Sequence, residues 1–356
     1  MTAQGASSIA DELVARLPAS PDVYPQKLDL IGQTLLLIQF DLSAYRAASF
    51  LDDRILRADT KGAWVPIHVA TDASHQVVNV RPLHFIFHTG HVGSTLVSRL
   101  LDETDEVLSL REPLPLRTLA EAHDSLSGFG SLLSDPQFEL LLTTFLRLWG
   151  RGYGLTRTVV VKATSSAGRM AAPILSRSER SRAIYLNLDA EPYLATLLAG
   201  QNSASDLRGH AVERIRRLQS RITSQLAPLH TLSIGELAAL SWAVETATQR
   251  ETVTRFRDKV MAVDFDDFLG DVAAGMRAIL AHFDVVADAR YLAQVSRSPV
   301  LTRYSKAPEF AYSVELRAQV LRDSRERNRE QIRKGMDWLD HLAQKDACVA
   351  QIVRAC

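Results

Sequence analysis

The stretch from His84 to Leu101, HFIFHTGHVGSTLVSRLL, most constrains what this chain can fold into. An apolar run breaks at a glycine-containing turn, and hydroxyl residues and then helical spacing follow. This order predicts a strand, a phosphate-binding loop and a helix. The loop departs from the pattern G-x-x-x-x-G-K-[ST], because Ser94 follows Gly93 at the position of the lysine. The missing lysine argues against an ATP or GTP hydrolase.

The loop can bind an anion without that lysine, because backbone N–H groups supply much of the grip on a phosphate. Glycine at two positions lets the chain approach an anion closely, and the hydroxyl residues lie at the positive end of the helix expected from about Leu96. The anion-binding residues that we expect are Gly90, His91, Val92, Gly93, Ser94 and Thr95. A plain strand-turn-helix connection, in which glycine serves only tight packing, is the alternative.

Apolar runs that alternate with segments of helical periodicity predict a parallel sheet covered by helices. The runs lie at 84–88, 107–110, 158–162, 183–188 and 259–264. Residues 203–258 and 314–353 form largely helical blocks. We therefore expect an α/β fold of the P-loop type, with three layers and a central parallel sheet flanked by helices.

Residues 1–80 are expected to form an N-terminal α+β extension that packs against the main sheet. Residues 81–356 would be the P-loop domain, with a helical C-terminal segment. Within the extension, the pattern predicts a helix near Ala10–Leu17, strands at Thr34–Phe40 and Trp64–Ala70, and a loop at Thr71–Gln76.

Composition excludes several classes of protein. With 356 residues, 46% of them hydrophobic, the chain can bury a substantial core. Lys+Arg and Asp+Glu number 41 each, so no general field draws the chain to nucleic acid or to an anionic membrane. No apolar segment approaches membrane-spanning length, and the N-terminus lacks a basic-then-apolar signal. Cys348 and Cys356 show no CxxC spacing, so we expect a reducing cytoplasm and neither a disulfide framework nor a zinc site.

Three histidines, His84, His88 and His91, have a spacing that invites a metal-site interpretation. On a strand, however, residues four apart share a face but lie far from each other, and His91 already belongs to the turn. We therefore expect no metal. His91 is instead expected to act as a weaker substitute for the loop cation. In its protonated form it would donate to a phosphate or sulfate oxygen, so its contribution would fade as the pH rises.

The loop resembles the 5′-phosphosulfate loop of the sulfotransferases, whose bacterial members carry G-R-x-G-S/T-T-L-L-x-x-L-L after a strand. Further segments resemble that family in the same order, from about residue 83 to residue 283. They are Leu110–Pro113, Val159–Ser165, Ala183–Leu198 and Val263–Leu269. Two family cations are missing, since His91 stands at a Lys or Arg position and Leu188 stands where an arginine grips a 3′-phosphate.

The resemblance implies transfer of a sulfuryl group from 3′-phosphoadenylyl sulfate (PAPS) to a hydroxyl or amine of a small acceptor. The loop would hold the 5′-phosphosulfate, Lys162 would stabilise the transferred group, and Glu112 would be the base. Thr196, with Arg303 or Lys306, would reach the 3′-phosphate. Lys162 follows an apolar run, so it would point into the crevice at the carboxyl ends of the strands.

Other interpretations remain open for these residues. Lys162 can simply extend from a strand end, and Glu112 can pair with Arg111 at the surface. His123 is a competing base. At the level of function, the alternatives are a kinase-like phosphotransferase and a noncatalytic descendant that binds an anion or nucleotide. The acceptor pocket would be built from segments such as 113–150 and 203–235, and the sequence names neither the acceptor nor the oligomeric state.

Overall fold

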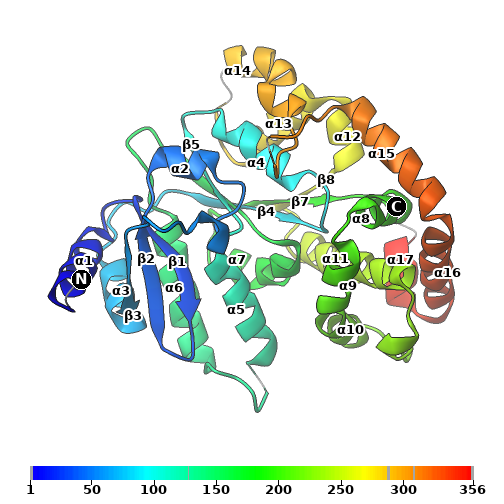
Figure 1. Ribbon diagram of the computed structural model, residues 1–356, viewed down its shortest axis with the longest axis horizontal. Coiled ribbons are helices and arrows are strands. Elements are labelled where there is room, and N and C mark those ends of the chain that lie inside the picture. Colours follow the sequence, from blue (N-terminus) through cyan, green and yellow to red (C-terminus); the bar gives the residue numbers. More distant parts are fainter. Residues whose placement is uncertain (1–2, 127, 287–288, 308, 354–356) are drawn as a thin grey trace.

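The computed structural model describes residues 3–126, 128–286, 289–307 and 309–353. Its centre is an all-parallel sheet in the order β5-β6-β4-β7-β8 (Figure 1). The strands are β4 (Leu83–His88), β5 (Val107–Arg111), β6 (Thr158–Lys162), β7 (Ala183–Asn187) and β8 (Val260–Asp264). All five coincide with the apolar runs of the sequence, so the predicted parallel sheet is confirmed. In β4, β5 and β6 every residue is buried, as expected where helices cover both faces.

Helices cover both faces of this sheet, and the side chains of β4 alternate between two cores. Phe85 and Phe87 belong to one core, whereas Ile86 belongs to the other. The helices are α4 (Ser94–Asp102), α5 (Leu114–Ser125), α6 (Asp135–Trp149), α7 (Ala171–Leu175), α8 (Ala190–Ala199), α9 (Ser203–Gly209), α10 (Ala211–Gln219), α11 (Ile234–Arg255), α12 (Phe265–Gly270), α13 (Val272–His282), α14 (Ala289–Gln294), α15 (Val314–Arg327), α16 (Arg329–Lys345) and α17 (Ala347–Val353). The helical blocks expected at 203–258 and 314–353 are thus present.

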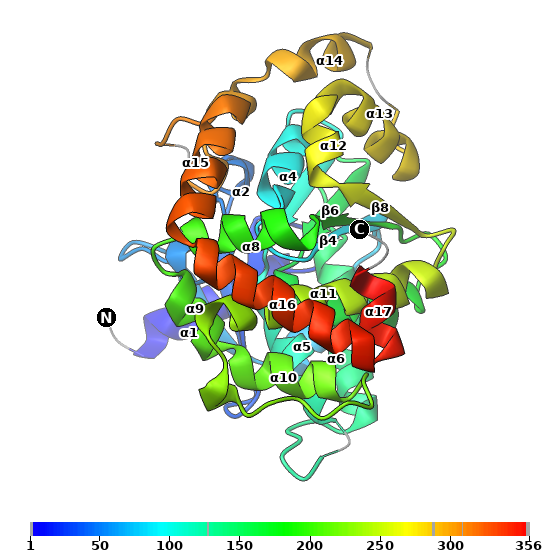
Figure 2. The same cartoon turned by 90° about the vertical axis from the view of Figure 1, so that its right-hand side faces the viewer.

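The C-terminal helices lie on the side of the sheet opposite to the N-terminal elements (Figure 1). Figure 2 shows α16 crossing in front of α11, with which it is in contact. The other long helix of this block, α15, packs on α8. These contacts bury Leu339 of α16 in the same core as Ile86. Within the described ranges, every helix falls short of the length and apolarity that crossing a bilayer requires.

The N-terminal segment forms a second sheet, antiparallel, in the order β1-β2-β3. Its elements are α1 (Ala3–Arg16), β1 (Val23–Asp29), β2 (Thr34–Gln39), α2 (Leu42–Ala47), η1 (Asp53–Ile55), β3 (Gly62–Pro66) and α3 (Ile67–His75). Leu37 of this sheet and Phe85 of the central sheet belong to one hydrophobic core. The N-terminal segment therefore packs on the face of the central sheet that carries Phe85.

Two local predictions in this segment are wrong. The strand expected at Trp64–Ala70 ends at Pro66, and the residues expected to form the loop Thr71–Gln76 belong mostly to α3. Ala70, Ala73 and Ser74 are buried at spacings of three and four, which is the pattern of a helix face. The helix places Thr71 against Thr144 of α6, with 3.4 Å between the two hydroxyl oxygens. Packing on α6 therefore decides a conformation that the short apolar run left ambiguous.

Candidate active site

The loop between β4 and α4 has the backbone conformation of an anion cradle. Gly90, His91 and Gly93 have φ angles of 109°, 56° and 68°, all in the left-handed region. The N–H groups of residues 90–93 donate to no acceptor among the described residues. Successive backbone donors around left-handed residues form a concavity that favours anions. The loop therefore offers the donors that the sequence pattern predicts.

Helix α4 extends this cradle with a hydroxyl group. The helix begins at Ser94, and Gly93 before it supplies no side-chain cap. Thr95 is 1% exposed, and its Oγ1 has no hydrogen-bond partner among the described residues although the side chain lines a cavity. A buried hydroxyl without a partner is costly unless a ligand completes it. Thr95, in the first turn of α4, thus carries a buried hydroxyl without a partner beside that cavity.

Two neighbouring cavities open at this end of the sheet. The first, of about 220 Å³, is mainly polar, and Glu112, Arg214 and Tyr193 are among its lining residues. The second, of about 370 Å³, is mainly apolar, and Phe265, Tyr304 and Tyr312 are among its lining residues. His91 and Lys306 line both cavities. A group that passes from one cavity to the other therefore passes these two side chains.

Glu112 and Lys162 are brought together at the carboxyl ends of β5 and β6. Their side chains form an ion pair, and the Glu112 N–H donates to the Lys162 carbonyl over 2.6 Å. Glu112 has a φ of 54°, an unusual conformation for a residue with a Cβ. Lys162 is fully buried; burial lowers its pKa to about 8, although the Glu112 charge acts in the opposite direction. Glu112 lines the polar cavity, and Lys162 is its fully buried cationic partner.

Lys306 approaches this pair from a distant part of the chain. It lies in the loop 302–312, where Arg303 bridges to Ala311 and the Tyr304 N–H donates to the Phe310 carbonyl over 2.8 Å. Burial lowers the pKa of Lys306, whereas the negative charge of Glu112 raises it. Lys306 therefore lies within electrostatic range of Glu112 and supplies a second cation at the junction of the cavities.

The histidines of β4 and the loop are less basic than free histidine. Desolvation and then the charge of Lys306 lower the pKa of His91. Burial and then the charge of Lys162 lower the pKa of His88, whose Nε2 donates to the Ala163 carbonyl over 2.9 Å. Both imidazoles are therefore neutral near pH 7. The protonated His91 expected from the sequence is disfavoured, and Lys306 and Lys162 are the cations at this point.

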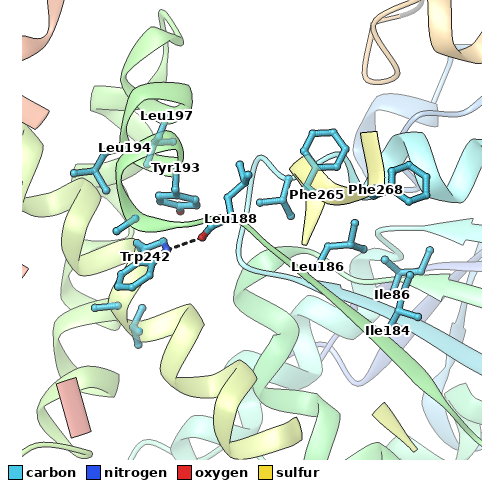
Figure 3. Close-up of a cluster of buried hydrophobic side chains, with 14 of the residues drawn as sticks. Ile86, Ile184, Leu186, Leu188, Tyr193, Leu194, Leu197, Trp242, Phe265 and Phe268 are labelled. Carbon is cyan, nitrogen blue, oxygen red and sulfur yellow. Dashed lines mark hydrogen bonds between the residues drawn. The ribbon is translucent and has the colours of Figure 1, made fainter. Parts of the chain in front are cut away.

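The positions expected to bind a 3′-phosphate lie around the second cavity. Thr196 and Arg303 line it, and the Thr196 hydroxyl donates to the Pro192 carbonyl over 2.7 Å. Leu188 is buried, and its carbonyl accepts a 2.9 Å hydrogen bond from Trp242 Nε1 (Figure 3). The place of the family arginine is therefore part of the hydrophobic core in this chain.

Several residues of the two cavities were not predicted from the sequence. Phe50, from the N-terminal segment, lines the polar cavity and lies with its ring centre 5.8 Å from Lys162 Nζ. Arg317 of α15 lines the apolar cavity, pairs with Asp266 at 2.7 Å and has its guanidinium 5.2 Å from the ring centre of Phe265. Neither belongs to a motif; Arg317 lies in a charge-rich helix that is typical of a solvated surface.

Arg111, considered as an ion-pair partner of Glu112, and His123, considered as an alternative base, both lie away from the Glu112 side chain. Arg111 forms an ion pair with Asp102, and its Nε donates to the Ala48 carbonyl over 2.7 Å, so it does not pair with Glu112. His123 lines a different cavity together with Asp124. Of the two candidate bases, only Glu112 faces the polar cavity that Lys162 and Lys306 approach.

The remaining histidine of the sequence motif has a packing role. His84 stacks on Phe283 with ring centres 4.8 Å apart, and its Nδ1 accepts from the Arg182 N–H over 3.1 Å. Burial lowers the pKa of His84 to about 4. Across the described ranges, no three His, Cys, Asp or Glu side chains are arranged as metal ligands.

No protein-family model and no curated protein sequence matches the chain. Three solved structures similar to this chain are sulfotransferases. The sulfotransferase domain from the curacin biosynthetic pathway is 14% identical, with a TM-score of 0.37 over 66% of this chain and 85% of that domain. The sulfotransferase from Alicyclobacillus acidocaldarius is 14% identical, with a TM-score of 0.36 over 71% of this chain and 96% of that one.

The third structure, sulfotransferase STF9 from Mycobacterium avium, is 12% identical, with a TM-score of 0.37 over 90% of this chain and 96% of that one. All three identities lie far below those that carry function from one protein to another. The functional assignment of this chain therefore depends on the residues of its own site.

Proposed function

We propose that this protein is a sulfotransferase, which moves a sulfuryl group from PAPS in the apolar cavity to a small acceptor in the polar cavity. The observation that carries the proposal is the junction at which His91 and Lys306 line both cavities, with the Glu112–Lys162 pair beside it. A group-transfer enzyme needs two adjoining sites with cations and one base between them. The sequence segments that resemble sulfotransferases support the same assignment.

In this proposal the donor lies against the start of α4. The N–H groups of residues 90–93 and the Thr95 hydroxyl would hold the 5′-phosphosulfate, as the unpaired donors and the helix N-terminus favour. The rings of Tyr304 and Tyr312 line the space that an adenine would occupy. Leu188 stands where the sulfotransferases have an arginine that grips the 3′-phosphate. Arg317 and Arg303 line the apolar cavity and would supply positive charge for that phosphate instead.

The reaction would be an in-line transfer at sulfur. The acceptor oxygen or nitrogen forms a bond to sulfur while the bond from sulfur to the phosphate oxygen breaks, leaving 3′-phosphoadenosine 5′-phosphate. Glu112 accepts the proton of the acceptor, and Lys162 and Lys306 stabilise charge on the sulfuryl and phosphate oxygens. Fixed cations act strongly here because Lys162 is fully buried.

Residues 1–80 contribute to this site in the proposal, since Phe50 would form a wall of the acceptor cavity. We assign them as an extension to the P-loop domain of residues 81–356. The acceptor would be a small molecule, because the polar cavity measures about 220 Å³. Electrical neutrality, with 41 basic and 41 acidic residues, offers no general attraction to nucleic acid. A reducing cytoplasm remains the proposed location.

Ligand preference tests the donor. The protein is heated with 3′-phosphoadenosine 5′-phosphate, ADP, ATP or GTP, and selective binding to the native state raises the unfolding temperature. We expect the 3′-phosphorylated nucleotide to stabilise most. Equal or greater stabilisation by ATP or GTP would favour the kinase-like alternative instead.

Transfer of radiolabelled sulfur from PAPS to a panel of small alcohols and amines tests catalysis. We expect a labelled product from the wild-type protein and loss of at least about a hundredfold in Lys306→Ala. Lys334→Ala is the matched control, because Lys334 lies in α16 and pairs with Glu330 at 2.8 Å, away from both cavities. Tight nucleotide binding without any labelled product would favour a noncatalytic binding protein.

A further inference from the structure

One arginine in the polar cavity has no role in the reaction described above. Arg214 lies in α10, is 7% exposed and lines the polar cavity. Its Nη2 lies 3.4 Å from Asp206 Oδ2, whereas its Nε and Nη1 are buried and have no hydrogen-bond partner among the described residues. A buried guanidinium with unpaired donors is costly unless an anion completes it.

The neighbouring arginine of the same helix shows what a structural arginine looks like in this fold. Arg217 is also 7% exposed and its Nε likewise has no partner among the described residues. Its two Nη groups, however, hold Glu245 through two contacts, at 2.9 Å and 3.2 Å, and Glu213 at 2.9 Å. Arg214 has one long contact to Asp206 instead. Asp206 is itself shared, because its other oxygen lies 3.7 Å from His210 Nε2. The charge of Arg214 is thus incompletely balanced by its carboxylate partner.

Other groups around the cavity do not supply the missing anion. Arg117 and Lys306 line the same cavity and are cationic, and Glu112 is paired with Lys162. His210 also lines the cavity and offers a further polar contact beside Arg214. The side of the cavity formed by α9 and α10 therefore favours a negatively charged group.

We propose that the acceptor carries an anionic group, a carboxylate or phosphate, which binds Arg214 while its hydroxyl or amine faces Glu112. This inference rests on the proposed function for the identity of the reacting group. The planar guanidinium suits both anions, since it can donate two parallel hydrogen bonds to either. A cavity of about 220 Å³ restricts the acceptor to a small molecule. Arg214 would set the specificity for the acceptor rather than take part in the chemistry.

The test uses matched pairs of probes with the donor site filled by saturating 3′-phosphoadenosine 5′-phosphate. The carboxylate pairs are glucuronate with glucose, glycerate with glycerol, and 4-hydroxybenzoate with 4-hydroxybenzyl alcohol. Glycerol 3-phosphate with glycerol distinguishes phosphate from carboxylate. Binding is measured by calorimetry to wild type, Arg214→Gln, Arg214→Lys and Arg216→Gln. Arg216 is the control, because it is exposed on the same helix.

We expect at least one anionic probe to bind wild type at least tenfold more tightly than its neutral partner. Arg214→Gln should weaken that binding by about ten- to a hundredfold, Arg214→Lys should restore part of it, and Arg216→Gln should leave it unchanged. Equal binding of neutral and anionic probes, binding of no anionic probe, or undiminished binding by Arg214→Gln would overturn the inference.

The affinity of the nucleotide itself separates this inference from the proposed function. Arg214→Gln should bind 3′-phosphoadenosine 5′-phosphate as wild type does, and a comparable loss of nucleotide binding would place Arg214 at the donor instead. Failure of wild type to bind that nucleotide would contradict the proposed function. In that case the probes are measured without nucleotide. Selective binding of an anionic probe through Arg214 would then still support an anion-binding role for Arg214, independently of the proposed function.

Discussion

Arg99 Nε donates a 2.8 Å hydrogen bond to the carbonyl of Ser305, a residue 206 positions later in the chain. Arg99 lies in α4, the helix that follows the glycine-containing loop after β4, and Ser305 precedes Lys306. The same guanidinium donates from Nη2 to Ser49 Oγ over 2.8 Å. One side chain therefore connects the loop that carries Lys306 to the N-terminal segment that carries Phe50, and both of these residues line the polar cavity.

Replacement of Arg99 should loosen the loop that carries Lys306. We expect Arg99→Ala to weaken binding of 3′-phosphoadenosine 5′-phosphate by about ten- to 150-fold, because a hydrogen bond from a charged group contributes about 1.5–3 kcal/mol. Amide exchange in residues 302–307 should become faster. Arg46→Ala is the control, since the exposed Arg46 side chain pairs with Asp105 at 3.0 Å. Unchanged exchange in residues 302–307 would show that the loop holds its place without Arg99.

The pH dependence of nucleotide binding should report Lys162. Its lowered pKa of about 8 means that the ammonium is present at pH 7 and is lost as the pH rises through about 8. We expect affinity for 3′-phosphoadenosine 5′-phosphate to fall in that range, well below the ordinary lysine range. The negative charge of Glu112 raises this pKa, so Glu112→Gln should move the fall to lower pH. An affinity that is flat between pH 7 and pH 9 would remove Lys162 from the donor site.

Glu112→Gln should separate binding from chemistry. The amide keeps the shape of the side chain but cannot accept the proton of the acceptor, so we expect turnover to drop by roughly two to four orders of magnitude. Nucleotide affinity should persist within a few fold when it is measured at a pH below the range in which Lys162 of this variant loses its proton. Glu106→Gln, at the partly exposed partner of Arg157, should leave both quantities unchanged. Turnover of Glu112→Gln within a few fold of wild type would exclude Glu112 as the base.

Gly93→Ala should destabilise the protein as well as the loop. Gly93 has a φ of 68°, and a Cβ at this position would lie 1.9 Å from Cε2 of Phe265. We expect the free energy of unfolding to fall by about 1–3 kcal/mol, because overpacking adds to the strain of a left-handed residue. Gly154→Ala is the matched control, since a Cβ there has open space and no left-handed φ. Chemical denaturation of the two variants compares these costs.

The double variant Gly93→Ala/Phe265→Leu checks the cause of that loss. Measured against Phe265→Leu alone, the Gly93→Ala change should cost less than it does in the wild-type background if contact with the Phe265 ring is responsible, and the same if backbone strain alone is responsible. The sequence suggests a different consequence for a larger residue, namely that Gly93→Val fills the space of the anion. The structure shows that a side chain at position 93 first meets Phe265, so loss of nucleotide binding in Gly93→Val would also include a packing defect.

The sequence by itself determined the central sheet and the glycine-containing loop between β4 and α4. Short-range patterns suffice there: apolar runs mark the buried strands, and glycine with hydroxyl residues marks the turn into α4. The positions of Glu112 and Lys162 followed as well, because parallel strands bring their carboxyl ends to one edge. The end of β3 at Pro66 and the start of α3 after it did not follow from the sequence. Helix α3 packs on α6, and the local pattern of residues does not show that contact.

Only the tertiary structure decided which distant side chains complete the site. Phe50, Arg214 and Lys306 come from three separate parts of the chain and line one cavity, although none belongs to a contiguous motif with the others. Sequence spacing predicts neighbours along a strand or helix, but the contact of remote loops depends on how whole layers pack and on single bonds such as Arg99 to Ser305. Desolvation and the charge of Lys306 lower the pKa of His91, and two buried donors of Arg214 have no partner among the described residues, because desolvation and contacts between distant side chains exist only in the folded chain.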